Sequence, residues 1–91
     1  MNRLRTLETA IELVCGDREQ SYGKVEDNFQ TIADLWSTYL GYEVLPKDVA
    51  ALMILLKVAR IKAGPKADNW VDAAGYAACG AELEGIYSEE R

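Results

Sequence analysis

Two cations in the middle of the chain are the residues best suited to bind an anionic ligand. Lys57 and Arg60 lie three residues apart in a segment that we expect to be helical, so their side chains share one face. A guanidinium can bind phosphate through two parallel hydrogen bonds, and an ammonium adds a point charge. Because both follow the apolar run 49–56, we expect them to project into a crevice. They predict a phosphate site, with ion pairing to Asp68 or Asp72 as the alternative.

A polar stripe further along the chain could recognise the rest of such a ligand. Asn69, Asp72 and Tyr76 follow one another at spacings of three and four, which places them on one face of a helix. An amide, a carboxylate and a phenol can hydrogen-bond to ribose hydroxyls and base edges. The alternative is a buried polar network between helices. Asp72 also follows Trp70 and precedes an alanine-rich stretch, and a carboxylate in such surroundings requires a partner.

The polar segment 17–24 adds further candidates, because it is long for a helix connection and functional side chains are frequent in such loops. Arg18 and Lys24 supply positive charge, and Tyr22 could stack on a base. Asn28 lies near the start of the next helix, whereas Trp36 is better placed in the core. The predicted ligand-binding residues are therefore Arg18, Tyr22, Lys24, Asn28, Lys57, Arg60, Asn69, Asp72 and Tyr76.

Carboxylate pairs offer a different chemistry. The chain has no histidine, which removes the most frequent general base and all histidine-based triads. Glu8 and Glu12 are one turn apart in the first helical segment, and Asp68 and Asp72 are one turn apart in the last. These four could hold Mg²⁺, which prefers oxygen ligands, and otherwise no catalytic residue or cofactor is predicted. The alternatives are a solvated face for the glutamates and a favourable first-turn position for Asp68.

Four helical segments must position these residues. The first spans about residues 4–15 and ends at Gly16, and the second spans about 26–40 and ends at Gly41. The third begins at Pro46 and reaches about residue 63, and the fourth spans about 67–86. The first helix carries the apolar stripe Leu4, Leu7, Ile11 and Val14. The second carries the apolar face Phe29, Ile32, Ala33, Trp36, Tyr39 and Leu40.

The apolar run 49–56 predicts more than one chain. A helix that is apolar on every side is typical of complete burial, and a domain of 91 residues has few other helices to cover it. The fourth helix carries small residues that let another helix approach closely: Ala73, Ala74, Ala77, Ala78 and Ala81. We therefore expect a single all-α domain over residues 1–91, a compact bundle of about four helices that forms a homo-oligomer through helices.

Composition excludes several classes of partner. A net charge of −5 and a pI of about 4.6 argue against nucleic acid, whose phosphates select basic surfaces. The longest apolar run is too short for a membrane span, which takes about 20 residues. Cys15 and Cys79 are far apart and lie in apolar stretches, which predicts buried free thiols. The first residues do not form a signal peptide, so we expect a cytoplasmic protein.

Several blocks of the sequence resemble a family of short phage and prophage proteins of unassigned function. These blocks are Arg18, Tyr22-Gly23, Asp27-Asn28-Phe29, Ile32-Ala33, Leu35-Trp36, Lys57-Val58-Ala59-Arg60, Asp68-Asn69-Trp70-Val71-Asp72 and Gly75-Tyr76. A looser likeness connects the chain to the MazG-type all-α nucleotide pyrophosphohydrolases, which bind magnesium through an ExxE helix and a later ExxD helix. Asp68 and Asp72 look like the second element, but at a spacing of four, and no ExxE occurs in the chain.

Three functions follow as alternatives. By analogy with phage proteins that sequester nucleotide signals of host immunity, the first is a homo-oligomeric binder of a cyclic ADP-ribose-like molecule or a cyclic dinucleotide. Such a protein acts in the host cytoplasm and requires no turnover. The second is a magnesium-dependent nucleotide pyrophosphohydrolase, and the third is a phage protein that binds a host protein.

Overall fold

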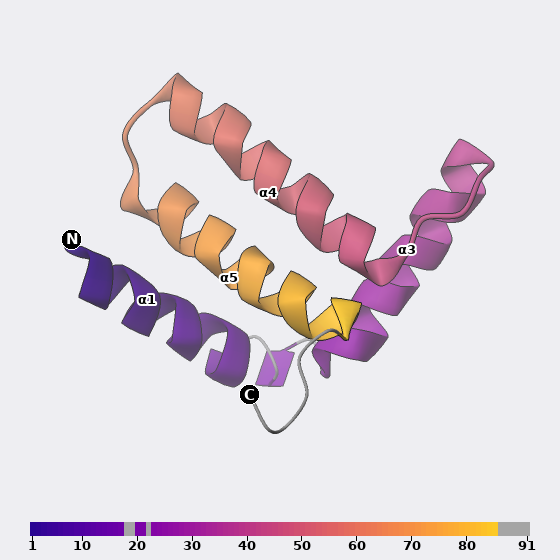
Figure 1. Cartoon of the computed structure of the whole chain (residues 1–91), viewed down its shortest axis with the longest axis horizontal. Helices are drawn as coiled ribbons and strands as arrows, with labels where there is room; N and C mark the ends of the chain where they lie inside the picture. Colours follow the sequence, from indigo (N-terminus) through magenta and orange to yellow (C-terminus); the bar gives the residue numbers. More distant parts are fainter. Residues whose placement is uncertain (18–19, 22, 86–91) are drawn as a thin grey trace.

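The computed structural model describes residues 1–17, 20–21 and 23–85, and its elements are all helical (Figure 1). The elements are α1 (Arg3–Glu12), a π-helical turn η1 (Leu13–Asp17), α3 (Val25–Leu40), α4 (Pro46–Ala63) and α5 (Ala67–Glu84). No strand occurs in the described residues. The predicted all-α class and its four helices are thereby confirmed. None of the described helices is long and apolar enough to cross a membrane.

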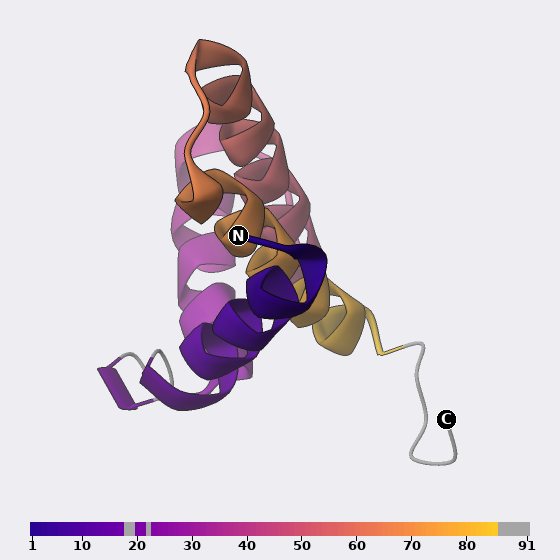
Figure 2. The same cartoon turned by 90° about the vertical axis from the view of Figure 1, so that its left-hand side faces the viewer.

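An antiparallel hairpin of α4 and α5 forms the centre of the molecule. Residues 64–66 connect the two helices, which pack side by side (Figure 1). The first helix, α1, packs on α5, whereas α3 crosses the other end of the hairpin and packs mainly on α4. Figure 2, which turns the view by 90°, shows α1 in front of the hairpin and α3 behind it. Each outer helix therefore covers only part of α4 and α5.

Local sequence sets the ends of these helices. The Asn2 side chain accepts a hydrogen bond from the Arg5 amide at 2.8 Å and so caps α1. Gly41 ends α3 with a φ of 80°, which a glycine adopts readily. Pro46 is the first residue of α4, and the Asp48 carboxylate accepts a hydrogen bond from the Leu45 amide at 3.0 Å. The predicted end of α3 and start of α4 are confirmed.

The core lies where α3 crosses the hairpin. Phe29 and Ala33 of α3 are buried against Val49 and Ala50 of α4 and Cys79 of α5. The rings of Phe29 and Tyr76 lie 6.5 Å apart at 56°, a favourable tilted arrangement. Ile32 and Trp36 are partly buried against this cluster, as predicted from the apolar face of α3.

Small residues on α5 let its neighbours approach closely. A Cβ atom on Gly75 would lie 3.0 Å from Cγ1 of Val14, and one on Gly80 would lie 3.2 Å from the Ala50 Cβ. Both distances are shorter than an ordinary van der Waals contact. The close approach to α5 thus occurs at these two glycines, whereas Ala77 and Ala78 of the predicted small-residue surface are exposed.

Gly75→Leu is expected to lower stability by about 1–3 kcal/mol, because a larger side chain must push η1 away from α5. The measurement is urea denaturation followed by circular dichroism. Ala77→Leu on the exposed side of α5 is the control and should have little effect. If the Gly75→Leu variant were as stable as the parent protein, η1 would be able to move away from α5 without a cost in free energy.

The structure corrects the predictions for the first helix. The α-helix ends at Glu12, and Gly16 lies inside the π turn rather than after the helix. Leu4, Leu7 and Ile11 are exposed, because α1 packs only on α5 and buries Ala10 there. Cys15, in η1, is exposed rather than buried as predicted, whereas Cys79 is buried; both are free thiols.

Two further apolar surfaces are exposed where the sequence predicted burial. Tyr39 and Leu40 are 88% and 48% exposed at the C-terminal end of α3, and this end of the helix extends beyond the hairpin (Figure 1). In α4, which was predicted to be buried on every side, Val49 and Ala50 are buried but Leu55 is 62% exposed. The single chain covers only one side of α4. The homo-oligomer stays a prediction.

Candidate phosphate-binding pocket

A polar pocket of about 540 Å³ lies between the C-terminal half of α4 and the start of α5. It is lined by Lys57, Arg60, Ala63, Gly64, Lys66, Asp68, Asn69 and Asp72. The turn at residues 64–66 joins the two helices, which lie side by side (Figure 1), and cationic residues of α4 line the same pocket as polar residues of α5. The expectation that Lys57 and Arg60 project into a crevice is confirmed. The volume lies in the range of small-ligand pockets.

Lys57 and Asp72 form the inner wall of this pocket. The Lys57 Nζ lies 2.7 Å from the Asp72 Oδ2, a charge-assisted hydrogen bond. Lys57 is only 8% exposed, so its ammonium requires this counter-charge. The Asp72 side chain retains 32% exposure. The sequence-based expectation of a basic partner for Asp72, and the alternative of an ion pair for Lys57, are both confirmed.

Arg60 and Lys66 form the outer wall. Both are exposed, and neither has an ion pair among the residues that the structure describes. Lys66 is the N-cap residue of α5 and makes no side-chain cap, so no N-cap side chain accepts a hydrogen bond from the first-turn amides, which are groups that can bind an anion. The sequence prediction missed Lys66. Its position directly after Gly64-Pro65, at the start of a helix, was the signal for it.

The polar stripe of α5 divides between the pocket and the core. Asn69 is buried and lines the pocket beside Asp72. Tyr76, two turns after Asn69, does not line it; its ring instead packs against Phe29 in the core. A spacing of seven places residues on one face but two turns apart, and the pocket extends over only the first turns of α5.

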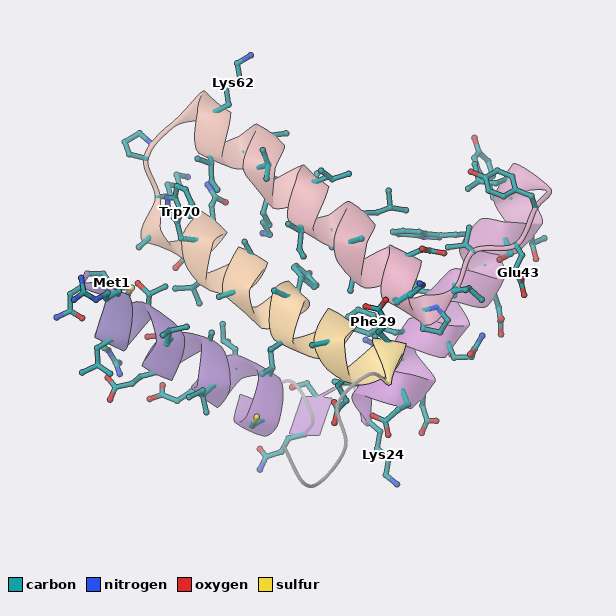
Figure 3. All side chains as sticks on the ribbon, in the orientation of Figure 1. Met1, Lys24, Phe29, Glu43, Lys62 and Trp70 are labelled. Atoms are coloured by element: carbon teal, nitrogen blue, oxygen red, sulfur yellow. The ribbon has the colours of Figure 1, made fainter. Side chains whose placement is uncertain are left out.

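The remaining predicted ligand residues lie elsewhere. Lys24 is exposed at the start of α3, far from Trp70 on the first turn of α5 (Figure 3). Asn28 is on the next turn of α3, beside Phe29, and does not line this pocket. Arg18 and Tyr22 lie outside the described residues. The structure therefore brings together Lys57, Arg60, Asn69 and Asp72 of the predicted set.

The four carboxylates of the predicted magnesium set occupy two helices. Glu8 and Glu12 are exposed on α1, where they lie 3.9 Å and 3.5 Å from the Arg5 guanidinium. Asp68 and Asp72 line the pocket on α5. Within the described part of the chain, no group of three or more acidic or cysteine residues is arranged to hold a metal ion. The glutamates match the solvated face that was their alternative.

Fold and pocket together define a small all-α domain with a mixed-charge polar pocket at one end of a helical hairpin. The chain belongs to the family described as "domain of unknown function (DUF6378)", whose model matches residues 5–84. This result confirms the resemblance to a family of short phage proteins. No solved structure is significantly similar to the chain.

Two relatives are phage proteins. The Gene 55 protein of Mycobacterium phage D29 is 48% identical over 84 residues, which cover 91% of this chain and 54% of the relative. The Gene 55 protein of Mycobacterium phage L5 is 49% identical over 73 residues, which cover 78% of this chain and 47% of the relative. The chain thus spans about half the length of the curated relatives that it matches.

Proposed function

We propose that this domain binds a phosphate-bearing nucleotide signal in the α4–α5 pocket and sequesters it without cleaving it. The observation that carries the proposal is the outer wall of the pocket, where Arg60 and Lys66 face an open helix start without ion pairs in the described structure. Such a wall suits a phosphate group, which accepts forked hydrogen bonds from arginine and bonds from backbone amides.

The inner wall supports recognition of a sugar or base. Asp72 uses Oδ2 for Lys57, which leaves Oδ1 to accept a hydrogen bond from a ribose hydroxyl. Beside Asp72, the Asn69 side chain has an amide NH2 group that can donate hydrogen bonds and a carbonyl oxygen that can accept them. The pocket therefore combines cations for phosphate with neutral and acidic groups for the nucleoside. Cyclic ADP-ribose-like molecules and cyclic dinucleotides carry both kinds of group.

Sequestration is favoured over hydrolysis by the residues themselves. The chain has no histidine, and its described acidic residues do not gather into a metal-binding group. The pyrophosphohydrolase alternative needs several carboxylates around magnesium. Relatives encoded by phages agree with a role against host signalling, in which tight binding alone removes the signal.

Arg60→Ala is expected to weaken nucleotide binding roughly tenfold to a hundredfold, since each factor of ten corresponds to about 1.4 kcal/mol and charged hydrogen bonds contribute on that scale. Isothermal titration calorimetry with cyclic ADP-ribose isomers and cyclic dinucleotides measures the effect. Lys24→Ala is the control, because Lys24 is exposed but lies away from the pocket. Equal affinity of the Arg60→Ala variant and the parent would remove Arg60 from the site.

Native mass spectrometry with the same ligands, with and without magnesium, separates binding from turnover. A complex that gains the intact mass of one nucleotide without magnesium supports sequestration. Conversion of a nucleoside triphosphate to its monophosphate only with magnesium would instead support the hydrolase. Absence of any bound nucleotide across the panel would contradict the proposal.

A further inference from the structure

The solvent side of α4 carries a patterned surface that the pocket does not use. Asp48, Leu52, Leu55, Ala59 and Lys62 follow one another at alternating spacings of four and three, and so form one stripe along the helix. At 1.5 Å per residue this stripe is roughly 21 Å long. We call it the outward stripe of α4. Its centre is apolar, and its two ends carry opposite charges.

No other described element covers the middle of this stripe. Leu55 is 62% exposed, and its neighbours Leu52, Leu56 and Val58 are also exposed. Figure 3 shows the Lys62 side chain pointing away from α5 at the far end of α4. Lys62 has no ion pair with any described residue. Exposed leucines gathered on one face of a helix are typical of a contact surface rather than of scattered surface residues.

The charges at the two ends favour a second copy of this chain as the partner. Asp48 and Lys62 are each seven residues from Leu55, on opposite sides of it. When two copies of α4 pack antiparallel about a two-fold axis at Leu55, Asp48 of each copy therefore comes to lie beside Lys62 of the other. A parallel pair would place Asp48 beside Asp48 and Lys62 beside Lys62, where like charges repel.

The remaining stripe residues meet residues that flank the stripe on the other copy. In a two-fold contact centred on Leu55, Leu52 lies opposite Val58, and Ala59 lies opposite Ala51. The paired alanines allow the helices to approach closely, while the larger residues fill the space between them. Asp48 is half-buried at the start of α4 and also lines a groove beside α5. Its Oδ2 accepts a hydrogen bond from the Leu45 amide, which leaves Oδ1 to accept one from the partner's lysine.

We propose that the protein forms a two-fold symmetric homodimer through antiparallel contact of the outward stripes of α4, centred on Leu55. This contact covers the apolar side of α4 that the single chain leaves open. It does not depend on the proposed nucleotide ligand, because the pocket residues Lys57 and Arg60 are not part of the stripe. The dimer therefore forms with or without nucleotide.

Charge reversal gives the sharpest test. Asp48→Lys places lysines opposite each other in its homodimer, and Lys62→Asp places aspartates opposite each other, so each variant alone is expected to dimerise at least about tenfold more weakly. A mixture of the two variants restores both ion pairs in a heterodimer. Native mass spectrometry distinguishes this heterodimer by mass. Lys24→Asp, which changes an exposed lysine outside the stripe, should leave the homodimer intact.

Cross-linking tests the axis directly. In a Cys15→Ser background, Leu55→Cys should form a covalent dimer under mild oxidation, because a residue on the axis meets its own copy. Leu35→Cys is the matched control. The exposed fraction of Leu35, 65%, is similar to that of Leu55, but Leu35 lies on α3 and outside the stripe. The control should remain largely monomeric on a non-reducing gel.

Three results would overturn the proposal. The first is a parent protein that sediments as a monomer at tens of micromolar, which would mean that the stripe takes a different partner, such as another segment of a longer chain. The second is a dimer that neither charge reversal weakens. The third is an absence of heterodimer when the two charge-reversal variants, each shown to be folded by circular dichroism, are mixed.

Discussion

Phe29→Ala is expected to lower the free energy of unfolding by about 3–5 kcal/mol, which is the usual effect of removing a fully buried phenylalanine. Phe29 is only 1% exposed, and it is among the largest fully buried side chains in the described structure. A small domain has a total stability near the low end of about 5–15 kcal/mol. The variant should therefore be largely unfolded near body temperature.

The position of Phe29 explains the size of this effect. Its ring is the point where α3 meets Val49 of α4 and Tyr76 and Cys79 of α5. The buried residues of α3 in this cluster include Ala33, a small side chain, so the loss of the Phe29 ring removes most of the buried apolar surface that attaches the middle of α3. We expect the melting temperature measured by circular dichroism to fall by at least roughly 10 °C.

Tyr39→Ala is the matched control for Phe29→Ala. It also removes an aromatic ring from α3, but Tyr39 is 88% exposed on the part of the helix that extends beyond the hairpin. A change within about 0.5 kcal/mol is expected there. If both variants lost equal stability, the core would not be centred on Phe29, and the exposed end of α3 would have to be covered in solution.

Local sequence signals predicted where the helices begin and end, but they did not predict which helices pack against each other. Pro46 and Gly41 act within one turn of their own position, and the structure confirms the helix ends that they predict. The stripe of Leu4, Leu7 and Ile11 indicated a helix correctly, but periodicity does not identify which neighbour covers a face. Because α1 packs on α5 through Ala10, the leucines are exposed in the single chain.

The candidate site shows the same limit. Lys57, Arg60, Asn69 and Asp72 could be grouped from sequence because one short turn joins their two helices, so that nearby positions in the chain remain nearby in space. Tyr76 shares a helical face with Asn69 but lies two turns further along, where α3 crosses α5. The position of that crossing depends on contacts distant in sequence, and no local pattern indicated it.

Asp72→Ala is expected to lower the free energy of unfolding by about 2 kcal/mol, because it leaves the Lys57 ammonium without its counter-charge. Removing one partner of a fully buried pair costs about 3–5 kcal/mol. A smaller value is expected here because about a third of the Asp72 side chain is exposed, and water can partly replace the lost contact. Urea denaturation measures the difference.

A double-mutant cycle with Lys57→Met isolates the ion pair from other effects of the substitution. Methionine keeps the length of the lysine stem and removes the charge, so Asp72→Ala should lose much less stability in that background than in the parent. Asp68→Ala is the control, because it removes a carboxylate from the same pocket that forms no ion pair with any described residue. Equal losses from Asp72→Ala in both backgrounds would mean that the 2.7 Å contact contributes nothing to stability, and that Asp72 is retained for the pocket rather than for the fold.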